Sequence, residues 1–267
     1  MSERPAIAVL KGPGINCELE TQSAIVLAGG DAEVVHVGQF IDGGRQLNRY
    51  QGWVIPGGFS EGDAIRAGVV LARQLTEGYG EEVREFAESG RPILGICNGF
   101  QVLVETGLLP DVESDGRKTA TLTENLTANF ESRWVDLAVD QNAIGYTALG
   151  LGSLPARLRL PIANGEGRLV AAPDTMARLR LNTQILLRYC TPEGDPSMDP
   201  AYNPSGAMDS IAALCNPEGN VVGMMPHPER AVLAEHLVAH RRPDFNADNV
   251  PDGLRIMRSF VLYASSM

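Results

Sequence analysis

The sequence predicts an α/β protein with a central, mostly parallel sheet and helices on both of its faces. Two observations predict this fold. Over the first hundred residues, apolar runs of strand length alternate with longer runs whose apolar residues recur at helical spacing. Such alternation is typical of a parallel sheet whose strands are joined by helices. From about residue 119 to 225 the runs are strand-like, which predicts an additional antiparallel strand region.

The elements of the first half are placed by their apolar runs and by the residues that end them. Ala6–Leu10 is the first predicted strand. A helix is predicted over Cys17–Ala28, because Asn16 can open it and Gly29-Gly30 ends it. The further elements that we expect are strands at 34–37 and 53–55, helices at 65–76 and 81–88, a strand at 92–96 and a helix at 98–105.

The second half is predicted in the same way. Residues 191–206 are rich in proline and glycine, and we expect a loop there. The whole chain, 1–267, is expected to be one domain, with a loop insertion at 191–208 and a C-terminal helical extension over 231–267. The elements that we expect are strands at 134–139, 158–162, 169–171, 185–189, 211–214 and 221–225, and helices at 232–239 and 254–264.

Composition and charge exclude several classes of protein. A hydrophobic content of 44% and a charged content of 21% are ordinary for a soluble globular protein. The net charge of −11 argues against a nucleic-acid surface, which needs clustered lysine and arginine. We find no apolar stretch of membrane-spanning length and no signal-peptide pattern at the start. We therefore expect a cytoplasmic protein.

The cysteines are few and widely spaced. Cys17, Cys97, Cys190 and Cys215 form no CxxC pair, so we expect neither a zinc site nor a disulfide framework. A reducing cytoplasm fits this pattern. Cys17 lies just after the first predicted strand, where a reactive role is possible; a structural thiol is the favoured interpretation, because no histidine motif is reserved for it.

Residues 95–101, Gly-Ile-Cys-Asn-Gly-Phe-Gln, are the most informative segment. Cys97 ends a predicted strand and precedes a predicted helix. Gly95 and Gly99 allow the sharp, closely packed turn that a nucleophile elbow needs. The positive end of the helix dipole would point at the sulfur and favour the thiolate. Taken alone, Cys97 is better explained as a buried core thiol, so its predicted role depends on partners elsewhere in the chain.

His227 and Glu229 are those partners. Prolines at 226 and 228 hold the segment extended after a predicted strand, so the two side chains point to the same side. The histidine can take a thiol proton, and the carboxylate can orient the imidazole. The other histidines fit worse: His36 lies in a predicted strand, and His236 and His240 lie on the polar face of a predicted helix. The alternative interpretation of residues 226–229 is a solvated turn.

A third segment, Gly57-Gly58, follows the predicted strand at 53–55. Paired glycines after a strand can turn backbone N–H groups towards an anion. Together with the N–H of Asn98 they could stabilise a tetrahedral oxyanion. Residues 12–14, Gly-Pro-Gly, lack the third glycine of a dinucleotide site and the Gly-Lys-Ser/Thr of a P-loop, so they predict a turn.

These motifs resemble the class I (triad) glutamine amidotransferases. Closer similarity is to the glutaminase subunits of phosphoribosylformylglycinamidine synthase, which share further segments with this chain in the same order. Two positions depart from that pattern: Asn164 stands where a histidine is expected, and Glu61 where a tyrosine is common. The shared segments are 56–60 with 62–63, 66–68, Phe130 with 133–135, 161–163 with 165–167, and 224–230.

The resemblance implies a flavodoxin-like fold and a glutaminase that forms a cysteine thioester. Cys97, His227 and Glu229 would be its catalytic residues. It also places Gln101 near the site, although a packing or capping role remains open for this residue. Arg133 and Trp134 are expected to stabilise a strand. The implied oxyanion and glutamine-binding residues are Gly57, Gly58, Phe59, Asn98, Gly99 and Gln101, and no metal ligand is implied.

The resemblance also implies partners. A large, PurL-type synthase subunit would use ATP and Mg²⁺ to convert formylglycinamide ribonucleotide to the amidine, and a small, PurS-type subunit would bridge the complex. No cofactor is expected in this chain itself. Three alternatives stay open: the glutaminase of another amidotransferase complex, a PfpI-like cysteine hydrolase, and a non-catalytic binding module. In PfpI-like enzymes the base tends to follow the cysteine directly, whereas Asn98 follows Cys97 here.

Overall fold

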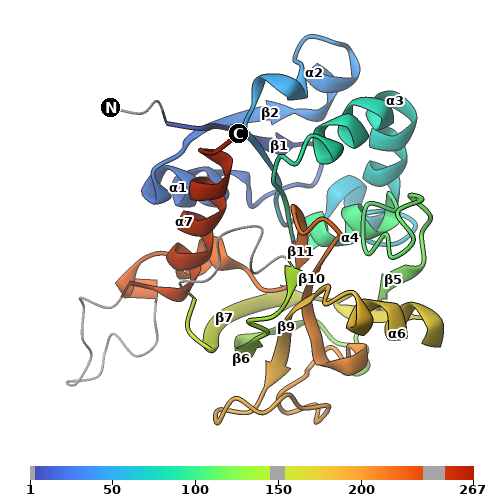
Figure 1. Ribbon diagram of the computed structural model, residues 1–267, viewed down its shortest axis with the longest axis vertical. Coiled ribbons are helices and arrows are strands. Elements are labelled where there is room, and N and C mark those ends of the chain that lie inside the picture. Colours follow the sequence, from blue (N-terminus) through green and yellow to red (C-terminus); the bar gives the residue numbers. More distant parts are fainter. Residues whose placement is uncertain (1–3, 145–153, 237–249) are drawn as a thin grey trace.

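The computed structural model, described over residues 4–144, 154–236 and 250–267, is built on one nine-stranded sheet (Figure 1). Five neighbouring strands run parallel and the remaining four are antiparallel. In sheet order the strands are β2 (Asp31–His36), β1 (Ala6–Lys11), β3 (Gly52–Ile55), β4 (Ile93–Ile96), β11 (Val221–Met224), β10 (Ile211–Cys215), β9 (Ile185–Cys190), β6 (Glu131–Val139) and β7 (Arg157–Asn164).

The register of three parallel strands brings their carboxyl ends together. Gly95 of β4 pairs with Ile55 of β3 on one side and with Gly223 of β11 on the other. All four residues of each of these strands are buried, as expected for the centre of a sheet covered on both faces. The loops that follow β3, β4 and β11 therefore lie beside one another, and they are the loops with the predicted Gly-Gly, cysteine and histidine motifs.

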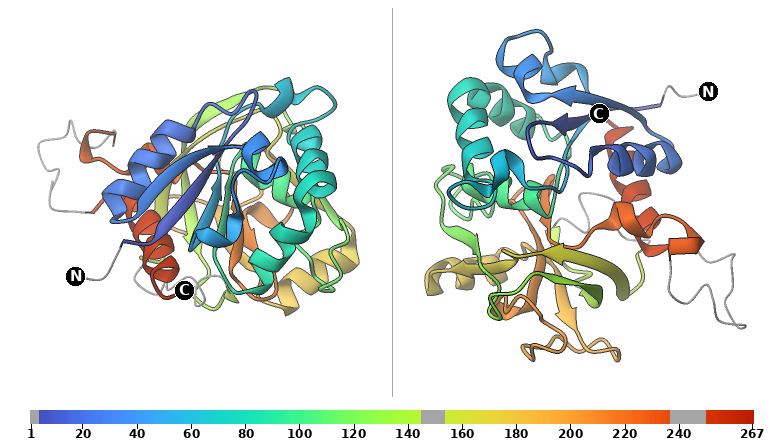
Figure 2. Two further views of the ribbon diagram at one scale, coloured as in Figure 1. Left: turned by 90° about the horizontal axis from the view of Figure 1, so that it is seen from above. Right: turned by 180° about the vertical axis from the view of Figure 1, so that it is seen from behind.

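Helices cover both faces of the parallel half, as predicted. On one face α1 (Glu18–Ala28) packs against α7 (Asp252–Ala264), and on the other α3 (Val69–Glu88) packs against α4 (Asn98–Glu105) (Figure 2). A short helix, α2 (Val37–Ile41), follows β2. The amphipathic pattern of α3 and α7 explains these positions, since each turns its apolar side towards the sheet and its polar side outwards.

One strand and one helix of the antiparallel half were not predicted. The strand is β5 (Ala120–Thr123), which pairs in a small second sheet with β8 (Arg168–Ala171), the strand expected at 169–171. A helix, α6 (Pro173–Leu181), follows β8, with its proline in the first turn, where the missing N–H costs nothing. Only three of its residues are buried, so its apolar pattern was too weak to indicate a helix.

Several predicted boundaries were wrong. The helices expected at 65–76 and 81–88 are the two halves of α3, which begins at Val69 and is kinked at Tyr79, where φ is −153°. The Tyr79 hydroxyl accepts a hydrogen bond from the Leu47 N–H at 2.8 Å. The break predicted between the two helices is therefore confirmed, whereas the start predicted at residue 65 was wrong. The N-cap of α1 is Cys17 rather than Asn16. In place of the helix expected at 232–239, the described part has a 3₁₀ turn at Ala234–His236; residues 237–239 lie outside the described residues.

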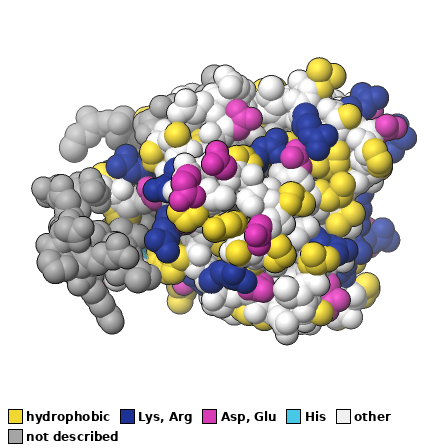
Figure 3. Space-filling model, turned by 90° about the horizontal axis from the view of Figure 1, so that it is seen from below, with side chains coloured by type: hydrophobic (Ala, Val, Ile, Leu, Met, Phe, Trp, Pro, Cys, Tyr) yellow, Lys and Arg dark blue, Asp and Glu magenta, His cyan; other side chains and the backbone are white. Residues whose placement is uncertain are grey.

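The 191–206 segment has neither helix nor strand, as predicted. The face seen from below in Figure 3 carries apolar side chains interspersed with charged side chains of both signs, so the net charge of −11 forms no continuous acidic surface there. Among the described helices, none has the length and apolarity needed to cross a bilayer.

Candidate active site

Cys97 occupies the tight turn between β4 and α4 that the sequence predicts. Its backbone has a φ of 50° and a ψ of −103°, a conformation that costs a residue with a side chain about 1–3 kcal/mol. The flanking glycines make the turn possible. A Cβ on Gly95 would lie 2.6 Å from the Gly99 carbonyl oxygen, and a Cβ on Gly99 would lie 1.9 Å from the Ile55 carbonyl oxygen. The turn thus presents the thiol above the sheet, at the N-terminus of a helix.

His227 lies directly after β11, beside this turn. Its backbone N–H donates to the Pro161 carbonyl at 2.8 Å, which holds His227 against β7. His227 itself is extended, but Pro228–Ala231 form a 3₁₀ helix, so the prediction of an extended chain through Glu229 was wrong; the tighter turn still brings the two side chains together. Nδ1 of His227 lies 2.6 Å from Oε1 of Glu229, and both side chains are buried. The imidazole also lies beside Cys97, since a Cβ on Gly57 would lie 2.8 Å from Cε1 of His227 and 3.5 Å from Cβ of Cys97, and its Nε2 has no hydrogen-bond partner among the described residues. Burial opposes the charge on His227, but Glu229 and Cys97 outweigh it and raise the histidine pKa well above 6.5.

The Gly57-Gly58 loop is supported by the turn that follows β1. The Gly14 carbonyl accepts from the Phe59 N–H at 2.8 Å, and the Gly57 carbonyl accepts from the Cys17 N–H at 3.2 Å. A Cβ on Gly14 would lie 2.0 Å from the Phe59 carbonyl oxygen. The Gly-Pro-Gly segment at 12–14 is a turn, as predicted. Its support of the Gly57-Gly58 loop was not indicated by the sequence.

Side-chain amides connect this loop to the α4 turn. Oδ1 of Asn98 accepts from the Ser60 N–H at 3.2 Å, and its Nδ2 donates to Oε1 of Gln101 at 2.9 Å. Nε2 of Gln101 donates to the Glu166 carbonyl at 2.6 Å. Gln101 therefore lies near the site, with both ends of its amide engaged by protein groups. Phe59, by contrast, is exposed and lies over Phe130, with 6.4 Å between ring centroids.

Residues 163–166 form a further side of the site. The Cys97 thiol donates to the Ala163 carbonyl at 3.6 Å. Nearby, burial and the Glu166 carboxylate raise the pKa of Asp63 to about 6. Asp63 is half-buried, and its Oδ1 has no hydrogen-bond partner among the described residues. Two carboxylates thus approach each other beside the predicted nucleophile.

Asn164, which departs from the family pattern, is buried in a hydrogen-bond network. Its Nδ2 donates to Oδ1 of Asn125 at 3.0 Å, and its own carbonyl accepts from Nδ2 of Asn125 at 2.8 Å. The network also holds the Gly167 N–H, which donates to Oδ1 of Asn125 at 2.9 Å. The side chain at position 164 therefore braces the segment that passes Cys97.

Cys17 lies closer to the site than the sequence indicated. Its thiol is buried and donates to Oδ1 of Asn16 at 3.3 Å, and Nη2 of Arg230 lies 3.1 Å from its sulfur. A Cβ on Gly57 would meet both the Cys17 sulfur, at 3.2 Å, and Cε1 of His227, at 2.8 Å. Burial raises the Cys17 pKa, although the contacts with His227 and Arg230 oppose that rise. Finding this contact required the strand order, because only the pairing of β1 with β3 places the loop after β1 beside Gly57.

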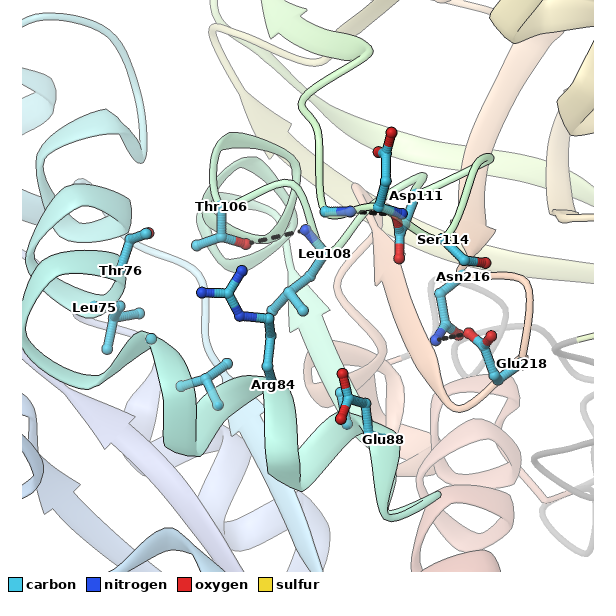
Figure 4. A pocket seen from close by; sticks show the side chains of 15 residues that line it. Leu75, Thr76, Arg84, Glu88, Thr106, Leu108, Asp111, Ser114, Asn216 and Glu218 are labelled. Carbon is cyan, nitrogen blue, oxygen red and sulfur yellow. Dashed lines mark hydrogen bonds between the residues drawn. The ribbon is translucent and has the colours of Figure 1, made fainter.

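A separate pocket of about 440 Å³ lies between α3, the segment after α4 and the β10–β11 turn (Figure 4). Arg84 and Glu88 reach it from α3, and Asp111 and Glu218 from the two loops. The Glu218 carboxylate is bonded to Asn216. None of the residues that line this pocket is a predicted site residue, and it holds neither a thiol nor an imidazole. The candidate active site is therefore the cluster around Cys97.

Comparisons with known proteins show the family to which this chain belongs. Residues 4–264 match the family model of the CobB/CobQ-like glutamine amidotransferase domain. Phosphoribosylformylglycinamidine synthase subunit PurQ of Dehalococcoides mccartyi is 38% identical over 259 residues, covering 96% of each chain. The subunit of the same name from Methanopyrus kandleri is 40% identical over 260 residues, covering 97% of this chain and 99% of that one.

Solved structures give the same result. A chain of the Thermotoga maritima PurLQS structure matches with a TM-score of 0.72 and 31% identity, covering 98% of this chain and 99% of that one. The glutaminase domain of Trypanosoma brucei CTPS has a TM-score of 0.56 and 13% identity over 98% of this chain and 94% of its own, so it supports the fold alone. This chain therefore belongs to the CobB/CobQ-like glutamine amidotransferases, in the family of phosphoribosylformylglycinamidine synthase PurQ subunits.

Proposed function

We propose that this chain hydrolyses glutamine at Cys97 and delivers the ammonia to a synthase subunit, as the glutaminase of a phosphoribosylformylglycinamidine synthase in purine biosynthesis. The observation that carries the proposal is the pairing of β4 with β11, whose carboxyl ends bring Cys97 and the buried His227–Glu229 pair together beside Gly57. A thiol beside an imidazole, which is itself oriented by a carboxylate, is the arrangement that nucleophilic acyl transfer needs.

The reaction follows from this arrangement in two halves. His227 takes the Cys97 proton, and the thiolate attacks the side-chain carboxamide carbon of glutamine. His227 then gives its proton to the leaving nitrogen, so ammonia departs and a γ-glutamyl thioester remains. Water, activated by the same imidazole, hydrolyses the thioester, and glutamate leaves as the thiol is restored. Glu229 holds the imidazole in place and stabilises its positive form.

Backbone donors stabilise the oxyanion in the proposed reaction. Asn98 is the first residue of α4, so its N–H is among those that find no acceptor within the helix. Gly58, with a φ of 153°, lies on the neighbouring loop that Cys17 and Gly14 support. A pair of N–H groups from Gly58 and Asn98 is the proposed oxyanion hole. In this proposal Gly57, Phe59, Gly99 and Gln101 shape the glutamine pocket.

A consumer of the ammonia is required, because ammonia released into water is protonated and no longer acts as a nucleophile. The proposed consumer is a large synthase subunit that uses ATP and Mg²⁺ on formylglycinamide ribonucleotide, with a small third subunit bridging the complex. The proposal places the complex in the cytoplasm. It treats residues 1–267 as one amidotransferase domain, in which the loop at 191–208 and the segment 231–267 are additions to the minimal glutaminase.

The test is amidine synthesis by the complex with either glutamine or ammonium as nitrogen donor. Cys97→Ala should abolish the glutamine-dependent reaction and leave the ammonium-dependent reaction intact. Cys190→Ala, which removes another buried thiol far along the sheet, is the matched control.

Each other outcome rejects part of the proposal. If Cys97→Ala keeps the glutamine-dependent synthesis, Cys97 is not the nucleophile. If glutamine never supports synthesis, even with wild type, the acceptor is wrong and another amidotransferase complex is the better assignment. Peptidase activity without glutaminase activity would instead support a PfpI-like hydrolase.

A further inference from the structure

We propose that Cys17, Glu20 and Nε2 of His227 form a binding site for Zn²⁺ or a similar divalent ion, with Glu229 orienting the imidazole, and that its occupancy inhibits the glutaminase. The side chains come from the start of α1 and from the loop after β11. Each offers one ligand atom, and these atoms all lie within 4.8 Å of one another. A thiol, an imidazole and a carboxylate are donors that zinc accepts, with water in the fourth position of a tetrahedral site.

The donor atoms are close to the spacing that zinc requires. Bond lengths of about 2.0–2.3 Å place the donors of a tetrahedral site about 3.3–3.8 Å apart. The donor atoms of Cys17, Glu20 and His227 must therefore approach by about 1–1.5 Å at most. Glu20 has room for this movement, because 38% of its side-chain surface is exposed. The site is thus nearly assembled before a metal enters.

A cation already lies between two of the donors. Nε of Arg230 is 2.9 Å from Oε1 of Glu20, and Nη2 of Arg230 is 3.1 Å from the Cys17 sulfur. The Arg230 side chain is 34% exposed, so it can turn out into solvent. Losing such a partly exposed ion pair costs about 0–1 kcal/mol. A divalent ion would replace this single charge and gain the imidazole as a ligand.

A buried ring nitrogen gives independent support. His227 is 2% exposed, and its Nε2 has no hydrogen-bond partner among the residues that the structure describes. A buried, unpaired polar nitrogen is costly, so a ligand beside it is favoured. Oε1 of Glu229 holds Nδ1 of the same ring at 2.6 Å, and carboxylate–histidine pairs of this kind orient imidazoles on metals.

Occupancy would stop the reaction without involving Cys97 as a ligand. Metal binding displaces the Cys17 proton to solvent and engages the His227 imidazole. An imidazole bound in this way cannot take the Cys97 proton; this consequence rests on the proposed function of His227. Synthesis from ammonium should continue, since it needs no proton transfer at His227.

The first test is a ZnCl₂ titration of glutamine-dependent synthesis by the intact complex, in buffer free of thiols and chelators. Cys17→Ser and Glu20→Gln are each measured relative to their own metal-free rates, with Cys190→Ala as the matched control thiol. We expect the zinc concentration for half-inhibition to rise at least about tenfold in the first two variants and to stay at the wild-type value in the control. If Cys17→Ser does not fold, Glu20→Gln still decides the question.

The second test measures metal binding directly and does not depend on enzyme activity. The complex containing Cys97→Ala should still bind one Zn²⁺ by calorimetry, and Co²⁺ should give a thiolate-to-cobalt charge-transfer absorption that disappears in Cys97→Ala/Cys17→Ser. The proposal is overturned if Cys97→Ala loses the metal, or if Cys17→Ser is inhibited at the wild-type zinc concentration, because Cys97 and His227 would then hold the ion. Failure of Cys97 as the nucleophile would leave this binding measurement valid.

Discussion

The Nδ1 atom of His227 lies 2.6 Å from Oε1 of Glu229, and neither side chain is accessible to solvent. The pair is two residues apart, with His227 extended and Glu229 in the 3₁₀ helix Pro228–Ala231, so the contact is local and needs no other element to form it. Its burial matters for chemistry, because a carboxylate acts more strongly on an imidazole where water is excluded.

The first prediction follows from this contact. Glu229→Gln keeps the size and the acceptor oxygen but removes the charge that stabilises protonated His227. We expect kcat for glutamine hydrolysis to fall by about 10²–10⁴-fold, while ammonium-dependent synthesis by the complex is retained. Glu77→Gln, which removes an exposed carboxylate paired with Arg73, is the control. A hydrolysis rate in Glu229→Gln close to that of wild type would show that the carboxylate has no catalytic part.

The second prediction concerns the support of the Gly57-Gly58 loop. In Gly14→Ala the new Cβ would lie 2.0 Å from the Phe59 carbonyl oxygen, so the loop must move. A displacement of about 1 Å can cost about 10²-fold in rate, and we expect a loss of that order in kcat for glutaminase.

Gly43→Ala is the matched control for this change. Gly43 also has a positive φ, of 71°, but a Cβ at this position would have no other atom within 4 Å. The variant should lose about 1–3 kcal/mol of stability from backbone strain and keep its kcat. Steady-state kinetics and thermal unfolding of both variants separate the two effects; equal losses of kcat would argue against a specific role of the Gly14 contact.

Local motifs in the sequence predicted much of this site, and long-range contacts account for the rest. The turn at Cys97 and the extended backbone of His227 depend on neighbouring glycines and prolines, so their shape could be read from the chain. The contact of Cys17 with Arg230 joins residues 213 positions apart, and no local pattern encodes it. The break between the two halves of α3 could be predicted, and the structure has it at Tyr79, but the buried hydrogen bond that Tyr79 accepts from Leu47 is a long-range contact that no local pattern encodes.

The third prediction concerns the network behind the site. Asn125 is buried, and its amide makes four hydrogen bonds, to the carbonyls of Asn129 and Asn164 and from the N–H groups of Asn164 and Gly167. Asn125→Ala leaves buried partners unsatisfied, so we expect the free energy of unfolding to fall by about 3 kcal/mol. Asn129→Ala, at an exposed position nearby, should change it by less than about 0.5 kcal/mol. Urea unfolding measures both; a small loss in Asn125→Ala would mean that water replaces the network.

The last prediction is a pH dependence of stability centred on Asp63. Its pKa is raised to about 6 by burial and by Glu166, above the value of about 4 expected in the unfolded chain. Between these two values the folded state binds more protons than the unfolded state, so this carboxyl lowers the stability of the wild type as pH rises. Asp63→Asn does not titrate, and it should therefore gain stability over wild type between pH 4 and pH 7.

The gain should be about 1 kcal/mol or less, because Asp63 is only half-buried and solvent screens it. Urea unfolding of wild type and Asp63→Asn across this pH range measures the difference. Glu166→Gln removes the neighbouring charge. In a protein that already carries Glu166→Gln, the stability gained by Asp63→Asn should therefore depend less on pH. A difference in the free energy of unfolding between Asp63→Asn and wild type that stays constant from pH 4 to pH 7 would contradict the raised pKa of Asp63. It would mean that water separates the Asp63 and Glu166 carboxylates.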